Sequence, residues 1–150
     1  MAGLRLGTEV TCLLDSFSVM KLQSSWDHSD QSHSGYILVV DDNEDTRDAF
    51  QALLETWGYV VKTADCGQRA LDIARADYPA VAFIDLSMPG MNGYETASRL
   101  RKLGDHRAKF FAVSACITDN DENELFDDLF QKPINLDLIW KLLKALSSTD

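Results

Sequence analysis

Five side chains that can do chemistry stand where apolar runs of this sequence end: Asp41, Asp42, Asp85, Ser114 and Lys132. The runs are YILVV before the two adjacent aspartates, AVAFI before Asp85, FFAV before Ser114 and LFQ before Lys132. A carboxylate at the tip of a buried strand is costly unless it is hydrogen-bonded, paired or bound to a metal. The aspartates therefore need partners, and the residues that share their site decide the function.

If the first and third of the predicted strands are neighbours, three carboxylates meet in one crevice. Their mutual repulsion raises the pKa of at least one of them or recruits a cation. Hard oxygen ligands with room for water suit Mg²⁺, which binds few carboxylates and shares phosphate oxygens. With the hydroxyl of Ser114 and the ammonium of Lys132, the set predicts a site for phosphoryl chemistry, in which an aspartate is a competent nucleophile.

Each of these residues also has a simpler interpretation. Asp41 and Asp42 could be the N-cap and a first-turn acid of a helix, which is the commoner reason for adjacent acids after an apolar run. Ser114 could form a turn, and Lys132 could lie at the surface. The common position of all five at the ends of strands favours the shared site.

The elements that must position these residues alternate between strand and helix from Tyr36 onward. Further strands are predicted at YVVKT and in KFFAVSA, and helices before Gly58, over GQRALDIARAD, from Tyr94 to Leu103 and from Leu136 to Leu146. This (βα)5 rhythm predicts an α/β fold, with a parallel sheet covered by helices on both faces. Such sheets bind ligands at the carboxyl ends of their strands, where the strand order reverses.

Four segments, ILVVDDNED, AFIDLSMPGMNGYE, VSA and QKPI, resemble the successive blocks of response-regulator receiver domains, especially those attached to hybrid histidine kinases. The resemblance extends from about Tyr36 to Leu146. Each block alone is a weak signal, but all of them in order form a strong one. The resemblance implies a flavodoxin-like fold, a doubly wound parallel sheet with strand order 2-1-3-4-5.

The resemblance also implies a metal site and a phosphoacceptor. Asp85 would accept a phosphoryl group from a histidine kinase or a histidine phosphotransfer protein. Asp42, Asp85 and the backbone carbonyl of Ser87 would hold Mg²⁺, and Asp41 would act through a metal-bound water.

Two more residues receive roles in the same way. Lys132 would contact the phosphoryl group and precede a cis peptide bond to Pro133. Ser114 matches the hydroxyl residue that moves towards the phosphoryl group on activation.

The sequence departs from the family pattern in two places. Leu129 occupies the switch position, where the family usually carries an aromatic residue, and Phe130 would point to the opposite face of the sheet. The segment between Ser114 and Lys132 is also short by about one helical turn. Its sequence, CITDNDENELFDD, is rich in acids and poor in bulky apolar residues, which predicts a shortened or frayed fourth helix.

Composition and charge restrict the class of protein further. The formal net charge of −10 argues against a basic surface for nucleic acid and against attraction to anionic membranes. Cys12, Cys66 and Cys116 are far apart, as expected for reduced thiols. With no apolar run near ~20 residues and no secretory h-region, the sequence predicts a soluble cytoplasmic protein.

Residues 1–34 differ in composition from the rest of the chain. They hold seven serines and are predicted to form an N-terminal tail or linker, with the receiver domain over residues 35–150. The spacing of Val10, Leu13, Leu14 and Phe17 leaves open a short amphipathic helix in this tail.

The leading hypothesis is a stand-alone receiver that is not an enzyme in the ordinary sense and signals to an unknown downstream protein. A homodimer is left open, because receivers often pair through the face that this chain alters. An adaptor that works without phosphorylation is the alternative. An aspartyl-phosphate phosphatase of the haloacid-dehalogenase kind is less favoured, because Asn43 stands where an Asp41-x-Asp motif needs its second acid.

Overall fold

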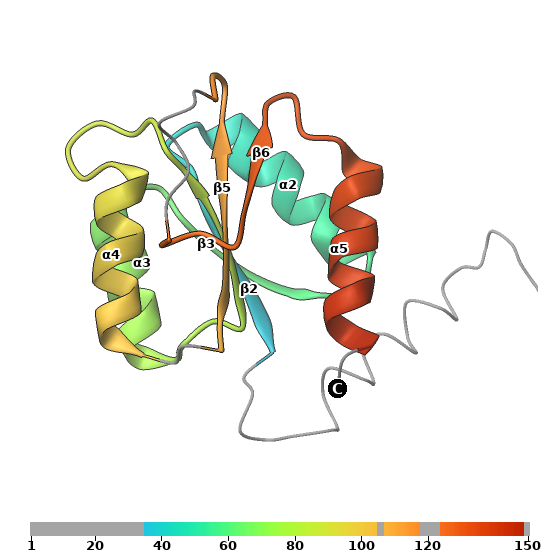
Figure 1. Cartoon of the computed structure of the whole chain (residues 1–150), viewed down its shortest axis with the longest axis horizontal. Coiled ribbons are helices and arrows are strands. Elements are labelled where there is room, and N and C mark those ends of the chain that lie inside the picture. The colour runs from blue at the N-terminus through green and yellow to red at the C-terminus, as the bar shows by residue number, and fades with distance from the viewer. Residues whose placement is uncertain (1–34, 105–106, 118–123, 149–150) are drawn as a thin grey trace, which may run out of the picture.

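The computed structural model describes residues 35–104, 107–117 and 124–148 of the chain. Five parallel strands form one sheet with helices on both faces (Figure 1). The strands are β2 (Tyr36–Val40), β3 (Val60–Ala64), β4 (Val81–Asp85), β5 (Lys109–Ser114) and β6 (Asp128–Gln131). The helices are α2 (Glu44–Thr56), α3 (Gly67–Ala76), α4 (Gly93–Leu103) and α5 (Leu136–Ser148).

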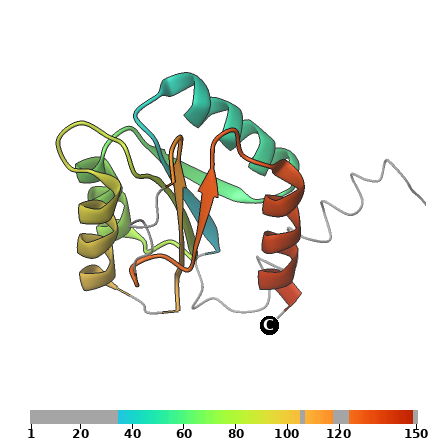
Figure 2. The same ribbon diagram turned by 45° about the horizontal axis from the view of Figure 1, so that its top comes forward.

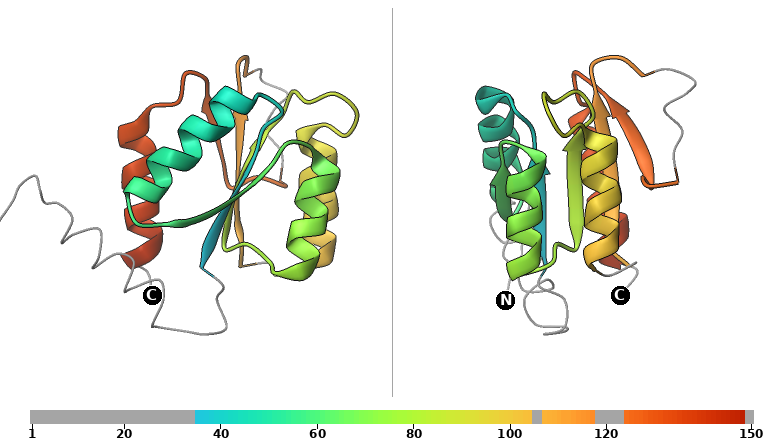
Figure 3. Two further views of the ribbon diagram at one scale, coloured as in Figure 1. Left: turned by 180° about the vertical axis from the view of Figure 1, so that it is seen from behind. Right: turned by 90° about the vertical axis from the view of Figure 1, so that its left-hand side faces the viewer.

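The strand order across the sheet is β3-β2-β4-β5-β6. Numbered along the chain, this is the order 2-1-3-4-5, so the predicted flavodoxin-like fold is confirmed. All neighbouring strands pair in parallel, and Figure 3 shows α2 and α5 on one face of the sheet and α3 and α4 on the other.

The strands are apolar because both of their faces are covered, so the alternation of side chains divides the core into two layers. In β2, Ile37 and Val39 pack towards α2 and α5, whereas Leu38 and Val40 pack towards α3 and α4. The same division continues to the last strand, where Leu129 joins the α3/α4 layer and Phe130 the α2/α5 layer. The prediction that these two residues face opposite sides of the sheet is confirmed.

Asparagine residues directly precede three of the helices, α2, α4 and α5. Asn43 is the N-cap of α2, where its side chain accepts from the Thr46 N–H at 2.9 Å, and the acids of the first turn are Glu44 and Asp45. The simpler interpretation of Asp41 and Asp42 as N-cap and first-turn acid is therefore wrong. Gly58 has a φ of 94° and directly follows the C-cap of α2, which is the place that its type predicts.

The short β6 forms one edge of the sheet and pairs with β5. The Leu129 N–H donates to the side chain of Asp128 at 2.8 Å. Between these strands, the described residues 115–117 and 124–127 contain no helix. The core of the predicted fourth helix falls on residues 118–123, outside the described part of the chain.

Two other sequence predictions concern features beyond the sheet. The predicted tail over residues 1–34 lies outside the described residues, so the boundary at residue 35 stays a prediction. None of the helices within the described ranges is long and apolar enough to cross a membrane.

Candidate functional site

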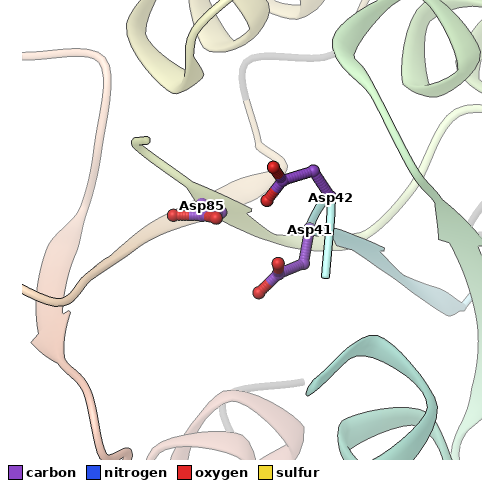
Figure 4. Close-up of side chains that lie close together, drawn as sticks. All are labelled: Asp41, Asp42 and Asp85. Atoms are coloured by element: carbon purple, nitrogen blue, oxygen red, sulfur yellow. The ribbon is translucent and has the colours of Figure 1, made fainter. Parts of the chain in front are cut away.

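The three aspartates meet at the carboxyl edge of the sheet, between β2 and β4. Asp41 and Asp42 directly follow β2, and Asp85 is the last residue of its neighbour β4. One carboxylate oxygen from each residue lies within 4.8 Å of the others, and Figure 4 shows the side chains gathered at the two strand ends. Figure 2 turns this edge of the sheet towards the viewer. The predicted neighbourhood of the first and third strands is thus confirmed, and it brings the acids together.

Asp41 is held by the protein at both main-chain groups and at both carboxylate oxygens. Its N–H donates to the Ala64 carbonyl at 3.1 Å, and its carbonyl accepts from Arg47 Nη1 at 2.8 Å. One carboxylate oxygen accepts from the Asn43 N–H at 2.9 Å, and the other accepts from Lys132 Nζ at 3.0 Å. Only 5% of Asp41 is exposed, so these contacts replace the water that a buried carboxylate needs.

Asp42 is the contrasting member of the pair. The residue is exposed, and no hydrogen bond or ion pair of its side chain is seen with the residues that the structure describes. Its carboxylate is therefore available to a ligand, whereas that of Asp41 is already committed to protein partners.

Asp85 faces these two acids from β4 and also lies near the lysine. It is 5% exposed, and one carboxylate oxygen accepts from the Ser87 N–H at 3.1 Å while the other is 3.6 Å from Lys132 Nζ. Burial raises the pKa of the Asp85 carboxyl, and the charges of Asp41 and Asp42 add to this effect. The Ser87 N–H and the Lys132 ammonium act in the opposite direction but do not cancel the shift. When Asp85 is ionised, the site therefore holds more negative than positive charge, and a bound cation would offset the difference.

Lys132 bridges two of the acids from the end of β6. Burial lowers the pKa of its amine, but hydrogen bonding and charge interaction with Asp41, followed by those with Asp85, outweigh burial and raise the pKa overall. Its N–H donates to the Ser114 carbonyl at 2.8 Å, and its peptide bond to Pro133 is cis, as predicted.

Ser114 lies at the same edge of the sheet, but its hydroxyl faces its own loop. The hydroxyl donates to the Cys116 carbonyl at 2.8 Å and accepts from the Cys116 N–H at 3.2 Å. The main chain of Ser114 meets Lys132, whereas its hydroxyl makes no contact with the acids among the described hydrogen bonds. The five predicted site residues therefore meet at one edge of the sheet, but the hydroxyl of Ser114 is bonded to its own loop and not to the acids.

The sequence prediction missed Arg47 and Asn43. Arg47 is the fourth residue of α2, near a helix end that favours acids over bases, and its guanidinium reaches back to the Asp41 carbonyl. That unfavourable position for a base was the available signal in the sequence. Asn43 joins the site to the helix, because its side chain caps α2 while its N–H holds Asp41.

The donor set fits a magnesium ion. Three carboxylates that converge at the edge of the sheet, one of them without a protein partner among the described contacts, are hard oxygen donors. Lys132 is the only ammonium within 4.0 Å of these carboxylates in the described part of the chain, so negative charge exceeds positive charge at the site. A divalent cation would balance it.

The acids thus cluster at the carboxyl edge of a doubly wound sheet, which is where sheets of this class bind their ligands. The model of the response regulator receiver domain family matches residues 37–144, so the chain belongs to that family. It is a receiver domain of two-component signalling, and such a domain is a signalling module rather than an ordinary enzyme. The family does not support the haloacid-dehalogenase interpretation.

The chain is similar to curated proteins of different lengths and kinds. The chain is 34% identical over 109 residues to an uncharacterized 14.6 kDa protein of Leptolyngbya boryana, a match that covers 69% of this chain and 83% of the relative. It is 32% identical to the response regulator MprA of Mycolicibacterium vanbaalenii, covering 73% of this chain and 49% of MprA. It is 31% identical to the sensor histidine kinase RcsC of Escherichia coli, covering 71% of this chain and 12% of the kinase.

Solved structures show the same fold. The chemotaxis protein CheY4 of Vibrio cholerae is 25% identical with a TM-score of 0.69, and the match covers 74% of this chain and 97% of CheY4. The response regulator TrrA of Thermotoga maritima, whose structure was determined with Mg²⁺ and BeF, is 29% identical with a TM-score of 0.65. This match covers 74% of this chain and 97% of TrrA.

Proposed function

We propose that Asp85 accepts a phosphoryl group from a phosphohistidine in a reaction that depends on Mg²⁺, and that the phosphorylated domain signals by binding another protein. The observation that carries this proposal is the position of the Asp85 carboxylate, which is 3.6 Å from Lys132 Nζ and gathered with those of Asp41 and Asp42. A nucleophilic carboxylate, an acidic metal site and a nearby ammonium are the groups that phosphoryl transfer to an aspartate requires.

The metal ligands would be the carboxylates of Asp42 and Asp85 and the backbone carbonyl of Ser87, with Asp41 acting through a bound water. This assignment is supported by the contrast between the two adjacent acids, because Asp41 is committed to Lys132 and Asn43. When bound, Mg²⁺ would neutralise carboxylate and phosphoryl oxygens. The presence of Mg²⁺ with BeF in the structure of TrrA agrees with this chemistry.

In the transfer step, a carboxylate oxygen of Asp85 forms a bond to phosphorus while the bond from phosphorus to the imidazole nitrogen breaks. The electron pair of the broken bond leaves with the imidazole, so the product is an acyl phosphate on Asp85. Lys132 supplies positive charge to the phosphoryl oxygens as it gives up part of its contact with Asp41. Ser114 would exchange its hydrogen bond to the Cys116 carbonyl for one to the phosphoryl group.

We infer the partners from the same chemistry. The donor would be a histidine kinase or a histidine phosphotransfer protein, and the receiver domain over residues 35–150 would act as a stand-alone module in the cytoplasm. The free thiols of Cys66 and Cys116 and the net charge of −10 support this location and the absence of direct nucleic-acid or membrane binding. A homodimer is the remaining partner that we keep open.

Incubation of the purified protein with acetyl phosphate and Mg²⁺, followed by intact-protein mass spectrometry, tests the proposal. The wild type is expected to gain one phosphoryl group, and Asp85→Asn is expected to gain none. Asp72→Asn on the exposed surface of α3 is the matched control and should behave as the wild type. A wild type that takes up no phosphoryl group from acetyl phosphate or from a candidate kinase contradicts the proposal.

An adaptor that works without phosphorylation is the second candidate function. Leu129 in the place of the usual aromatic residue favours it. In the family that aromatic side chain moves on activation and links the site to the surface that binds partners, and this chain would need another side chain for that link. Undiminished binding of Asp85→Asn to the downstream partner in the cell would support the adaptor over the phosphoacceptor.

A further inference from the structure

The residues that lead into β6 are held by one arginine of another element. Arg101 lies in the last turn of α4, and its side chain is 19% exposed. Its guanidinium lies over the ring of Phe110, 3.9 Å from the centroid. Nη1 donates to the Ala108 carbonyl at 2.8 Å, and Nε and Nη2 donate to the Leu125 carbonyl at 3.3 and 3.1 Å. The side chain therefore ties α4 to both the start of β5 and the approach to β6.

Asp127 is the second member of this cluster. Its N–H donates to the Phe110 carbonyl at 2.7 Å, and its Oδ2 accepts from the Phe110 N–H at 2.8 Å and from Arg101 Nη2 at 3.2 Å. Both main-chain groups of Phe110 are thus bonded to Asp127. In the register of the sheet, Phe111 pairs with Asp128, so Asp127 extends the same register by one residue.

The register of β6 matters because the strand is four residues long and pairs with β5. Side chains alternate between the two faces of a strand, so a slip of one residue would exchange the faces of Leu129 and Phe130. It would also displace Lys132, whose N–H meets the Ser114 carbonyl directly after the last paired residue. Arg101 and Asp127 bind the main chain at the opposite end of the strand from Lys132.

We propose that Arg101 and Asp127 are positioning residues that set the register of β6 and thereby place Lys132 Nζ beside Asp41 and Asp85. They act without contact to the reacting groups, through the main chain of β6. The effect on phosphoryl transfer rests on the proposed function, whereas the effect on the register does not.

Three substitutions separate positioning from general stability. Arg101→Met keeps an unbranched apolar side chain but removes the hydrogen-bond donors and the charge. Arg101→Lys keeps the charge without the planar guanidinium, and Asp127→Asn keeps an acceptor oxygen but removes the charge. Arg99→Met is the matched control, because Arg99 lies on the same helix and pairs with Glu95 at the surface. All measurements use the full chain at a temperature at which each variant is folded.

The first measurement is the pairing of β5 and β6 by NMR, from contacts between the main chains of Ala112 and Leu129. The second compares the rate of phosphorylation by acetyl phosphate with the affinity for Mg²⁺ from calorimetry. Arg101→Met is expected to weaken the cross-strand contacts and to lower the rate by about 10-fold to 100-fold, the cost of a misplaced group. Affinity for Mg²⁺ should not fall, since the three acids stand at the ends of β2 and β4 and lose a competing positive charge when Lys132 Nζ moves away. Arg101→Lys and Asp127→Asn should give intermediate rates.

If Arg101→Met lowers the melting temperature but leaves the cross-strand contacts and the rate unchanged, the positioning role is overturned. If Arg101→Met does not fold, the cross-strand contacts and the phosphorylation rates of Arg101→Lys and Asp127→Asn test the positioning role instead. A wild type that is not phosphorylated would contradict the proposed function alone, because the NMR contacts still test the register. Arg99→Met with the same defects as Arg101→Met would also overturn the proposal.

Discussion

At the scale of the residue, Asp85 shows how a binding site can lower the stability of the folded chain when no ligand is bound. The carboxyl group is buried beside two other acids, and the Ser87 N–H and Lys132 only partly compensate its charge. A side chain of this kind is kept for chemistry rather than for the stability of the fold. Its contribution to stability should therefore depend on pH in a definite direction.

Asp85→Asn is expected to raise the melting temperature of the metal-free protein by a few degrees at neutral pH. Burial raises the pKa of the Asp85 carboxyl in the folded chain, so the stabilising contribution of the protonated form is present below the ordinary aspartate pKa and is lost as the pH rises through the folded value. The neutral amide avoids this loss. Thermal unfolding in EDTA over a pH series should show a difference from the wild type that shrinks as the pH falls.

The exposed variant Asp72→Asn should show no such pH-dependent gain. An Asp85→Asn variant that is less stable than the wild type in EDTA at neutral pH would refute this account of the site.

At the scale of the element, the start of α4 lies directly against the strand that carries Asp85. A Cβ atom at Gly93 would lie 2.5 Å from the Asp85 carbonyl oxygen and 2.7 Å from the Cα of Leu86. Both neighbours are main-chain atoms, which cannot rotate away as a side chain can. The close approach of this helix thus depends on a glycine as its first residue.

Gly93→Ala is expected to lower the free energy of unfolding by about 1–3 kcal/mol, the usual cost of overpacking. It should also slow phosphorylation of Asp85, because relief of the clash displaces the main chain of that residue. Urea unfolding and the acetyl phosphate assay measure the two effects. Gly90→Asn is the control: Gly90 has a φ of 76°, which asparagine tolerates, and open space around it.

The sequence predicts the elements well because local patterns determine them. The continuous apolar run of β2, for example, directly indicates a strand covered on both faces. The close packing at Gly93 could not be predicted in this way, since it depends on how α4 approaches β4. The role of Arg101 was hidden for a similar reason: a basic residue in the last turn of a helix already has a local explanation, and its partner Asp127 is 26 residues away.

At the scale of the whole molecule, charge is the main property that ligand binding would change. The formal net charge is −10, and three acids converge at the edge of the sheet. A cation that binds the folded chain and not the unfolded one stabilises the fold by mass action. The expected magnesium site can thus be detected without any phosphoryl chemistry.

Mg²⁺ at about ten times its dissociation constant is expected to stabilise the protein by about 1.4 kcal/mol. The melting temperature should rise with Mg²⁺ and return to its starting value when EDTA removes the ion. NaCl at the same ionic strength controls for screening of the net charge. In Asp42→Asn the effect should be much smaller, and an equal response in that variant would exclude Asp42 as a ligand.

The main features of the candidate site follow from the sequence because strand ends in a parallel sheet meet at one edge. The order of the strands came from the family resemblance, since alternation of strand and helix alone fits several orders. The state of each side chain could not be predicted, as Asp42 and Ser114 show. The Asp42 carboxylate has no protein partner among the described residues, and the Ser114 hydroxyl is bonded to its own loop. Whether such a hydrogen bond forms depends on shifts of a few tenths of an ångström, which a sequence pattern does not specify.

The hydrogen bond from the Leu129 N–H to Asp128 has a consequence for solubility. Edge strands invite other chains to add to them, which is a route to aggregation. Here the edge strand is only four residues long, and one of its main-chain donors is already occupied by a side chain that also carries negative charge. At high concentration the receiver should therefore resist growth into fibrils from this edge, although the strand leads directly to Lys132, on which the proposed phosphoryl transfer depends.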